Sequence, residues 1–210
     1  MHNGILNWLV DIFLQYPEVI NGKNVIEVGS KYVNGSASHL AKLLKPAKYV
    51  GTDISAGDCV DDVVPVENLV TTYGKNSFDT VISTEMLEHV FDWRMGIQNM
   101  KDIVKPGGFL IITTCAKGFP YHAYPYDFWR FSIEDFKKIF SDFDIISLKE
   151  IERCSVFILA RKTQNIPADL SQIPIYSIAS GKVTTNLVKL TFNRKMRLFF
   201  RTFSLIDEIR

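Results

Sequence analysis

The sequence has few cysteines and no cysteine motif. Its three cysteines, Cys59, Cys115 and Cys154, are widely spaced and form no Cys-x-x-Cys pair. This usage suits a reducing compartment and argues against a disulfide scaffold. No group of histidines, cysteines and carboxylates has the spacing of a zinc motif, so no metal site is predicted from the sequence.

Long apolar runs and strong net charge are also missing. No uncharged apolar stretch approaches the roughly 20 residues that span a bilayer, and the N-terminus shows neither a basic n-region nor a cleavage site. The net charge of +1 over 210 residues gives no reason to expect a nucleic-acid partner. We therefore expect a cytoplasmic protein with its own core, since 47% of its residues are hydrophobic.

Charge is nevertheless unevenly placed along the chain. The segment from Lys182 to Arg210 holds seven basic and two acidic residues, interleaved with apolar ones. We therefore divide the chain into one domain, 1–162, and a C-terminal extension, 163–210. The extension ends in a basic amphipathic helix that docks on the domain or on a second subunit, as in a homodimer, or contacts an anionic membrane surface. Docking is favoured.

Strand-like and helix-like segments alternate through the first 162 residues. The pattern predicts helices over 5–13, 36–44, 93–104 and 132–140, and strands over 25–28, 49–53, 59–64, 78–83, 109–114, 143–148 and 156–160. Alternation of this kind predicts an α/β protein with helices on both faces of a parallel sheet. The last two strands lie close together in the chain. The fold class is thus a Rossmann-like doubly wound sheet, mostly parallel, with an antiparallel edge strand.

The loop after the first strand lacks the glycines of a dinucleotide site. Gly29 and Gly35 are present, but Lys31 and Asn34 stand at the positions of the second and third glycines of the Gly-x-Gly-x-x-Gly pattern. Those glycines let the backbone approach a pyrophosphate closely. Glu27 precedes the loop, and a carboxylate there would repel phosphate and could help to hold a cation. The loop therefore favours a positively charged cofactor without a pyrophosphate.

Five segments, in order, resemble class I S-adenosylmethionine (SAM)-dependent methyltransferases over roughly residues 20–160. They are Val25-Ile-Glu-Val-Gly29, Gly51-Thr-Asp53, residues 77–90 (SFDTVISTEMLEHV), Val104-Lys-Pro-Gly-Gly108 and the strand 109–114. The resemblance implies SAM as cofactor. It implies cofactor-binding roles for Glu27, Gly29, Ser30, Asp53, Ile54, Asp61, Val66, Glu67, Thr84 and Glu85.

Some of these roles can be stated more closely from the resemblance. Asp53 would hold the ribose, Ile54 would lie on the adenine, and Glu27 would lie behind the amino-acid end of the cofactor. Pro65 stands where many members of the family have aspartate, which is a departure at the contact with the adenine amino group. Lys31 in place of a second glycine is a departure from the commonest loop.

The aromatic loop over residues 119–131 (FPYHAYPYDFWRF) carries a second resemblance. It is similar to the His-x-Tyr-Pro-x-Asp-aromatic-Trp-Arg-Phe loop of a methyltransferase subgroup associated with sugar, capsule and other surface-polysaccharide biosynthesis. The loop follows the fifth strand, so it would lie over the reactive end of the cofactor. Aromatic faces suit a sulfonium or a sugar ring.

Four residues are the catalytic candidates. His122, in the aromatic loop, is the favoured general base for a hydroxyl acceptor, and His89, in the turn after the fourth strand, is the other histidine in reach. Arg130 offers a fork that matches phosphate or carboxylate, and Tyr124 lies in the same loop. The alternatives are that Arg130 pairs with Asp127 and that the aromatic residues are core.

These observations predict a SAM-dependent O-methyltransferase. Its expected acceptor is an oxygen of a small saccharide-related or phosphorylated molecule. Two alternatives stay open at this point. One is an NAD-dependent Rossmann oxidoreductase, which the loop disfavours, and the other is a methyltransferase-like scaffold without catalytic activity.

Overall fold

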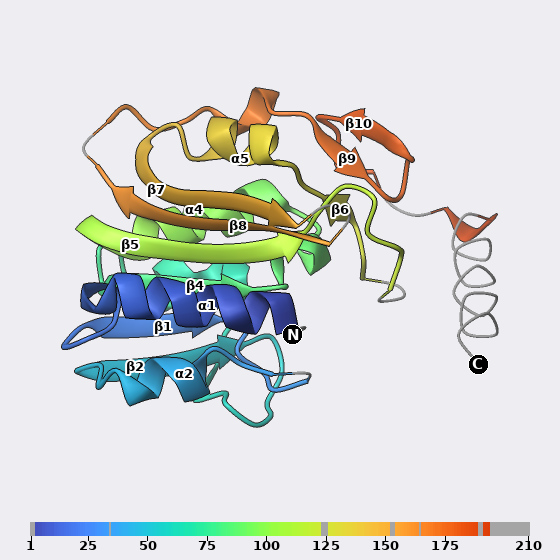
Figure 1. Cartoon of the computed structure of the whole chain (residues 1–210). Coiled ribbons are helices and arrows are strands. Elements are labelled where there is room, and N and C mark those ends of the chain that lie inside the picture. Colours follow the sequence, from blue (N-terminus) through green and yellow to red (C-terminus); the bar gives the residue numbers. More distant parts are fainter. Residues whose placement is uncertain are drawn as a thin grey trace.

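The fold is built on a seven-stranded sheet in the order β3-β2-β1-β4-β5-β8-β7 (Figure 1). The computed structural model describes residues 3–33, 35–122, 126–151, 154–163, 165–188 and 191–193. The strands of this sheet are β1 (Asn24–Val28), β2 (Lys48–Asp53), β3 (Asp62–Val63), β4 (Phe78–Thr84), β5 (Val104–Cys115), β7 (Phe143–Ile151) and β8 (Ser155–Lys162). Strands β1 to β5 pair in parallel, whereas β8 is antiparallel to β5 and β7. The predicted mostly parallel α/β sheet with an antiparallel edge is confirmed.

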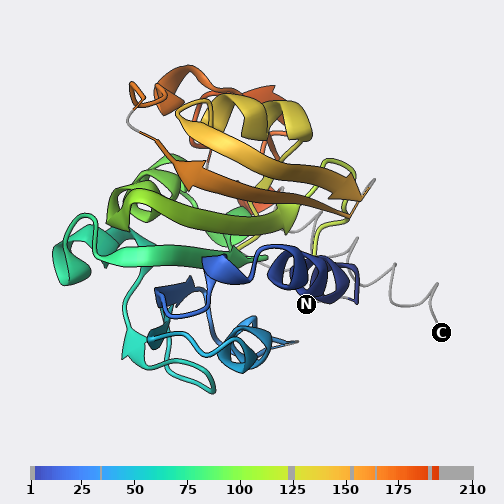
Figure 2. The same ribbon diagram turned by 60° about the vertical axis from the view of Figure 1, so that its left-hand side comes forward.

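Apolar side chains alternate between two cores, one on each face of the sheet. Val25 packs with α1 (Asn3–Gln15) and α2 (Ser38–Leu43), whereas the next residue, Ile26, packs on the opposite face. That face carries α3 (Leu69–Tyr73), α4 (Trp93–Ile103) and α5 (Ile133–Ile139). In Figure 1, α1 and α2 lie in front of the sheet and α4 behind it, and Figure 2 shows the same layers from the side. Burial on both faces explains why the central strands are nearly all apolar.

Two helices near the aromatic loop start at well-formed caps. The Ser132 hydroxyl accepts a hydrogen bond from the Asp135 N–H, and the Asp135 carboxylate accepts one from the Ser132 N–H at 2.9 Å, which makes a capping box. The Asp92 carboxylate caps α4 by accepting from the Met95 N–H at 3.2 Å. The described residues also contain four 3₁₀ turns: η1 (Pro17–Val19), η2 (Val66–Asn68), η3 (Leu87–His89) and η4 (Leu170–Gln172).

A second, three-stranded sheet joins the start of the predicted extension to the aromatic loop. It has the order β10 (Lys182–Thr184), β9 (Ile175–Ser177), β6 (Trp129–Arg130), all antiparallel. Arg94 of α4 donates hydrogen bonds to the carbonyls of Leu170 at 2.8 Å, Ile173 at 3.2 Å and Thr185 at 2.8 Å. Residues 165–188 therefore pack on the domain. The basic helix predicted over 187–209 falls almost wholly outside the described residues.

Three local expectations differ from the structure. The strand expected over 59–64 is reduced to Asp62–Val63, because Cys59 takes a positive φ of 68° and the Asp61 carboxylate turns back to accept from the Gly51 N–H at 2.7 Å. Helix α3 was not predicted, since its Leu-Val-Thr-Thr-Tyr sequence has β-branched residues that disfavour helix. Strand β5 begins at Val104, which pairs with Phe78, and not at residue 109, where the predicted strand begins.

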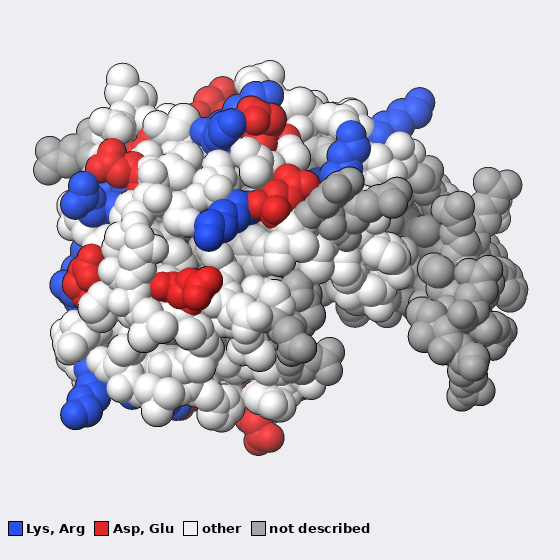
Figure 3. All heavy atoms as spheres, in the orientation of Figure 1, with Lys and Arg blue, Asp and Glu red and all other residues white. Residues whose placement is uncertain are grey.

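Surface charge is mixed on the face that Figure 3 shows. Basic and acidic side chains lie beside one another there and form no continuous basic patch among the described residues. Within the same residues, no helix combines the length and the apolar character that a bilayer-spanning segment needs.

Candidate functional site

A cavity of about 290 Å³ opens where β1, β2 and β4 end. Ligands bind at this position in doubly wound sheets, beyond the carboxyl ends of the strands. No lysine or arginine lines the cavity within the part of the chain that the structure describes, whereas two carboxylates, Asp53 and Glu67, do. Its walls are formed by Val28, Gly29, Asp53, Ile54, Val64, Pro65, Val66, Glu67, Met86, His89, Val90, Phe91, Tyr126 and Phe128.

The buried carboxylate of Glu27 holds the loop after β1 in place. It accepts hydrogen bonds from the hydroxyl of Ser36 at 2.8 Å, the N–H of Ala37 at 2.9 Å and the hydroxyl of Tyr49 at 2.7 Å. Burial raises the pKa of Glu27, although these three donors lower it in part. With its carboxylate engaged in this way, Glu27 shapes the loop rather than the cavity surface.

Gly29, directly after β1, lies close to Met86, which follows β4. It has a positive φ of 78°, and a Cβ at this position would lie 2.5 Å from Cγ of Met86. Both facts require glycine. The backbone of Gly29 therefore forms part of the cavity floor, while Ser30 is buried and donates its hydroxyl to the Cys59 carbonyl at 2.8 Å.

Asp53 presents the polar group at the end of β2. One carboxylate oxygen accepts from the Ser55 N–H at 3.0 Å and the other from the Lys31 N–H at 3.4 Å. A carboxylate has about four acceptor positions, so capacity remains on the cavity side. Beside it, Ile54 is 75% exposed, which places an apolar face over the opening.

A group of buried polar residues lies behind the cavity at the ends of β4 and β5. Glu88 is fully buried and accepts from the Thr114 hydroxyl at 2.8 Å and the Cys115 thiol at 3.3 Å. Glu85 takes a positive φ of 49° and accepts from the Ser155 hydroxyl at 3.2 Å. Burial, together with the nearby charge of Glu88, raises the pKa of Glu85 to about 8.

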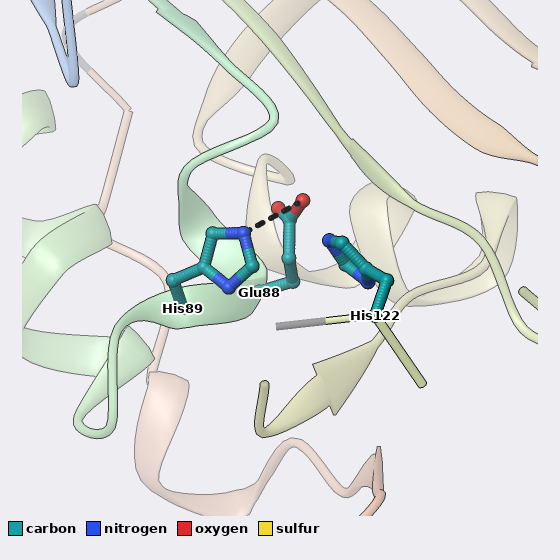
Figure 4. A group of neighbouring side chains, drawn as sticks. All are labelled: Glu88, His89 and His122. Carbon is teal, nitrogen blue, oxygen red and sulfur yellow. Dashed lines mark ion pairs between the residues drawn. The ribbon is translucent and has the colours of Figure 1, made fainter. Parts of the chain in front are cut away.

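Two histidines from distant parts of the chain meet at the edge of the cavity (Figure 4). The rings of His89 and His122 lie 5.1 Å apart, and His89 Nε2 lies 3.7 Å from a Glu88 carboxylate oxygen. The Nδ1 atom of His122 lies 3.2 Å from Asp127 Oδ2. Burial would lower the pKa of His122, but Asp127 and Glu88 raise it above the ordinary value.

Backbone and side-chain hydrogen bonds join the two segments that carry these histidines. The Phe128 N–H donates to the Glu88 carbonyl at 2.9 Å, and the Trp129 indole N–H donates to the carbonyls of Val90 at 3.0 Å and Phe91 at 3.1 Å. The indole is buried. The turn after β4 and the aromatic loop therefore form one unit.

Arg130 corrects one sequence-based assignment. Its side chain is 1% exposed, and its guanidinium donates to both Asp127 carboxylate oxygens and to the carbonyls of Phe119, Pro120 and Trp129. With all its N–H groups directed inward, Arg130 cannot offer a fork to an acceptor. The alternative, a pair with Asp127, is what the structure contains, and it fixes the loop.

The other predicted site residues divide into two groups. Gly29, Asp53, Ile54, Val66 and Glu67 line the cavity, as does His89. Glu27, Ser30, Asp61, Thr84 and Glu85 lie behind it or in the adjoining turns, and Tyr124 falls outside the described residues. Sequence reasoning did not select Met86, Glu88, Phe91, Tyr126 or Phe128. The Glu-Met-Leu-Glu-His turn contained the signal for Glu88, because a strand end in this fold faces the ligand.

Fold and cavity together define a Rossmann-like protein with a site for a small, phosphate-free cofactor. A sequence profile described as a methyltransferase domain matches residues 9–154. The chain belongs to this methyltransferase-domain family. A search of curated protein sequences gives no match.

Solved structures similar to this one include several methyltransferases. The 1,6-didemethyltoxoflavin-N1-methyltransferase of Burkholderia thailandensis, with bound S-adenosylhomocysteine, has a TM-score of 0.59 at 14% identity, over 72% of this chain and 76% of that one. TehB from Haemophilus influenzae has a TM-score of 0.58 at 17% identity, over 78% and 63%. The [4+2]-cyclase SpnF has a TM-score of 0.57 at 16% identity, over 75% and 81%. These likenesses show the fold.

The chain belongs to a methyltransferase-domain family, and the residues of its cavity fit SAM as the cofactor. Asp53 can accept from ribose hydroxyls, and Ile54 and Val66 offer apolar surface for a flat base. The glycine backbone allows close approach, and the two carboxylates suit a cation.

Proposed function

We propose that the protein transfers the methyl group of SAM to an oxygen of a small saccharide-related acceptor in surface-polysaccharide biosynthesis. The observation that carries the proposal is the two-sided cavity. The strand ends supply Asp53 and the Gly29 loop, which we call the cofactor end. The turn after β4 and the aromatic loop supply Phe91, Tyr126, Phe128 and His89, which we call the acceptor end. The expectations of a cytoplasmic location and of a homodimer stay predictions.

The cofactor end of the cavity favours SAM over NAD. A pyrophosphate is bound through a glycine-rich loop or by basic side chains. Lys31 and Asn34 replace two glycines of such a loop, and the described residues that line the cavity include no lysine or arginine. Its carboxylates would repel the phosphates of NAD but attract a sulfonium. The oxidoreductase alternative is therefore disfavoured by charge as well as by the loop sequence.

The acceptor end supports a saccharide. Phe91 and Phe128 pack edge to face with ring centroids 5.4 Å apart, and the neighbouring Tyr126 is 66% exposed. Aromatic surface beside a few polar groups is the usual lining of a small-molecule site. The burial of Arg130 removes the feature that favoured a phosphorylated acceptor.

This chain's residues position the acceptor and prepare its oxygen. When bound, SAM supplies a methyl group on a good leaving group, so that alignment is the main demand on the protein. Tyr126 and Phe128 of the aromatic loop line one side of the cavity. His89 lines the cavity there, with His122 beside it and the buried Glu88 behind it, and the Asp127–Arg130 pair fixes the loop that carries His122.

The proposal is tested by methyl transfer to a panel of nucleotide sugars, sugar phosphates and free sugars. Mass spectrometry should detect the addition of one methyl group to a member of the panel, and acid hydrolysis should leave the methyl on a sugar oxygen. Asp53→Ala protein is the control and should give no product. Transfer to nitrogen or carbon, or no product with any saccharide while S-adenosylhomocysteine still binds, would contradict the assigned acceptor class.

A further inference from the structure

The three polar side chains at the acceptor end form a group whose ligand atoms converge. Each of Glu88, His89 and His122 offers one donor atom, and these three atoms lie within 4.8 Å of one another. Figure 4 shows a nitrogen of each imidazole directed toward the Glu88 carboxylate. Ligands of one tetrahedral ion lie about 3.4 Å apart, given metal–ligand bonds of about 2.0–2.2 Å, so small side-chain rotations would close the group.

The other nitrogen of each ring is already engaged. His89 Nδ1 lies 2.5 Å from the Tyr126 carbonyl oxygen, and His122 Nδ1 lies 3.2 Å from the Asp127 carboxylate. Both partners are acceptors, so each ring can donate a hydrogen bond from Nδ1, which leaves Nε2 as the atom available to a metal ion. Metal-binding histidines have this arrangement, with an outer oxygen that fixes the tautomer and the ring orientation.

The Glu88 carboxylate is suited to the same role. It is fully buried, and both its protein donors, the Thr114 hydroxyl and the Cys115 thiol, are uncharged. A buried carboxylate is stabilised by a nearby positive charge. Glu85, a second carboxylate, lies next to it, with ligand atoms of Glu85, Glu88 and Cys115 within 4.8 Å of one another.

We propose that Glu88, His89 and His122 bind one divalent transition-metal ion at the acceptor end of the cavity. Two imidazoles and one carboxylate favour Zn²⁺, Fe²⁺, Co²⁺ or Ni²⁺ over Mg²⁺. The three ligands leave coordination positions for the acceptor on the side where His89 faces the cavity. Sequence spacing gave no sign of this site, because His122 is brought to His89 only by the folded aromatic loop.

The role of the ion is to activate the acceptor oxygen of the proposed methyl transfer, so this inference rests on the proposed function. Coordinated by the ion, the acceptor hydroxyl has a lowered pKa, so its O–H bond breaks and the proton passes to solvent. An electron pair of that oxygen then forms the bond to the methyl carbon, and the carbon–sulfur bond breaks to leave a neutral thioether. His122 acts as a ligand in this scheme, which replaces the direct base role predicted from the sequence.

The test is a titration of tag-free, chelator-treated protein with Co²⁺, followed by visible absorption, and with Zn²⁺, followed by calorimetry. Wild-type protein should bind one equivalent. His89→Ala, His122→Ala and Glu88→Gln should each weaken binding about 100-fold or more, since loss of a mere outer partner weakens it 10–100-fold. Millimolar Mg²⁺ should not displace Co²⁺.

His39→Ala is the matched control, because His39 is exposed on α2 and should leave metal binding unchanged. The His89 and His122 side chains are 30% and 35% exposed, so their alanine variants should fold, which circular dichroism checks. Absence of saturable binding by wild-type protein, or undiminished binding by His122→Ala, would overturn the metal site. S-adenosylhomocysteine binding by the same samples separates this failure from failure of the proposed methyl transfer.

Discussion

The two ends of the cavity are built in different ways. The cofactor end is made by the strand ends themselves: Gly29 follows β1, Asp53 ends β2, and Met86 follows β4. The acceptor end is made by two segments far apart in the chain, 86–91 and 119–131, which hydrogen bonds hold together. The sheet topology thus places the residues of the cofactor end. The acceptor end depends instead on the aromatic loop, which the buried Asp127–Arg130 pair fixes.

Arg130→Ala should cause the largest loss of stability among these variants. It should disturb the acceptor end and leave the cofactor end unchanged. Removing one partner of a buried ion pair destabilises a protein by about 3–5 kcal/mol, because the other charge is left uncompensated. Urea unfolding followed by circular dichroism measures this loss. Where the variant folds, its affinity for S-adenosylhomocysteine should stay within threefold of wild type, since Arg130 does not line the cavity.

Arg161→Ala is the matched control for that variant. Arg161 pairs with Asp144 on the surface, where the two side chains are 51% and 54% exposed, so its loss should change stability by no more than about 1 kcal/mol. Equal effects of the two substitutions would show that the Asp127–Arg130 pair does not organise the acceptor end.

Asp53→Ala should give the largest effect at the cofactor end. Two hydrogen bonds to a charged acceptor contribute about 1.5–3 kcal/mol each, so affinity for S-adenosylhomocysteine should fall by at least about 100-fold in calorimetry. Stability should change little, since Asp53 is only partly buried. Asp58→Ala, at an exposed residue of the same loop, controls for lost charge and should leave affinity within twofold. A similar loss in both variants would remove Asp53 from the contact.

Gly29→Ala should weaken both stability and cofactor binding, by a smaller amount. An alanine at a φ of 78° is strained by roughly 1–2 kcal/mol, and its Cβ would also overlap Met86. The double variant Gly29→Ala, Met86→Ala removes the overlap but not the strain, so it should recover part of the lost affinity. If the double variant is no better than the single one, the close approach to Met86 is not the cause.

Arg94→Ala should cause the smallest loss of stability among these variants. Its effect should again be confined to the acceptor end. It removes hydrogen bonds to three carbonyls of residues 165–188, whose strand β9 pairs with β6 of the aromatic loop. We expect a loss of about 1 kcal/mol in urea unfolding and faster amide exchange at Ile175 and Ser177. Unchanged exchange there would show that Arg94 does not secure this segment.

The same comparison explains how much could be predicted from the sequence. Apart from α3 and the length of β3, the strands and helices over residues 24–115 follow from hydrophobic patterns, so the strand ends that line the cavity were predictable. The acceptor end was predicted only as a loop with candidate residues. Whether Arg130 faces a ligand or Asp127 depends on tertiary burial, which the spacing of the two residues does not reveal. The β6–β9 pairing was missed because each strand is only two or three residues long.

Calorimetric titration with S-adenosylhomocysteine and, separately, with NAD tests the central claim most directly. The account predicts one S-adenosylhomocysteine bound per chain and no detectable heat with NAD, because the described lining of the cavity has carboxylates and no lysine or arginine. Binding of NAD, or failure of S-adenosylhomocysteine to bind the folded wild-type protein, would contradict it.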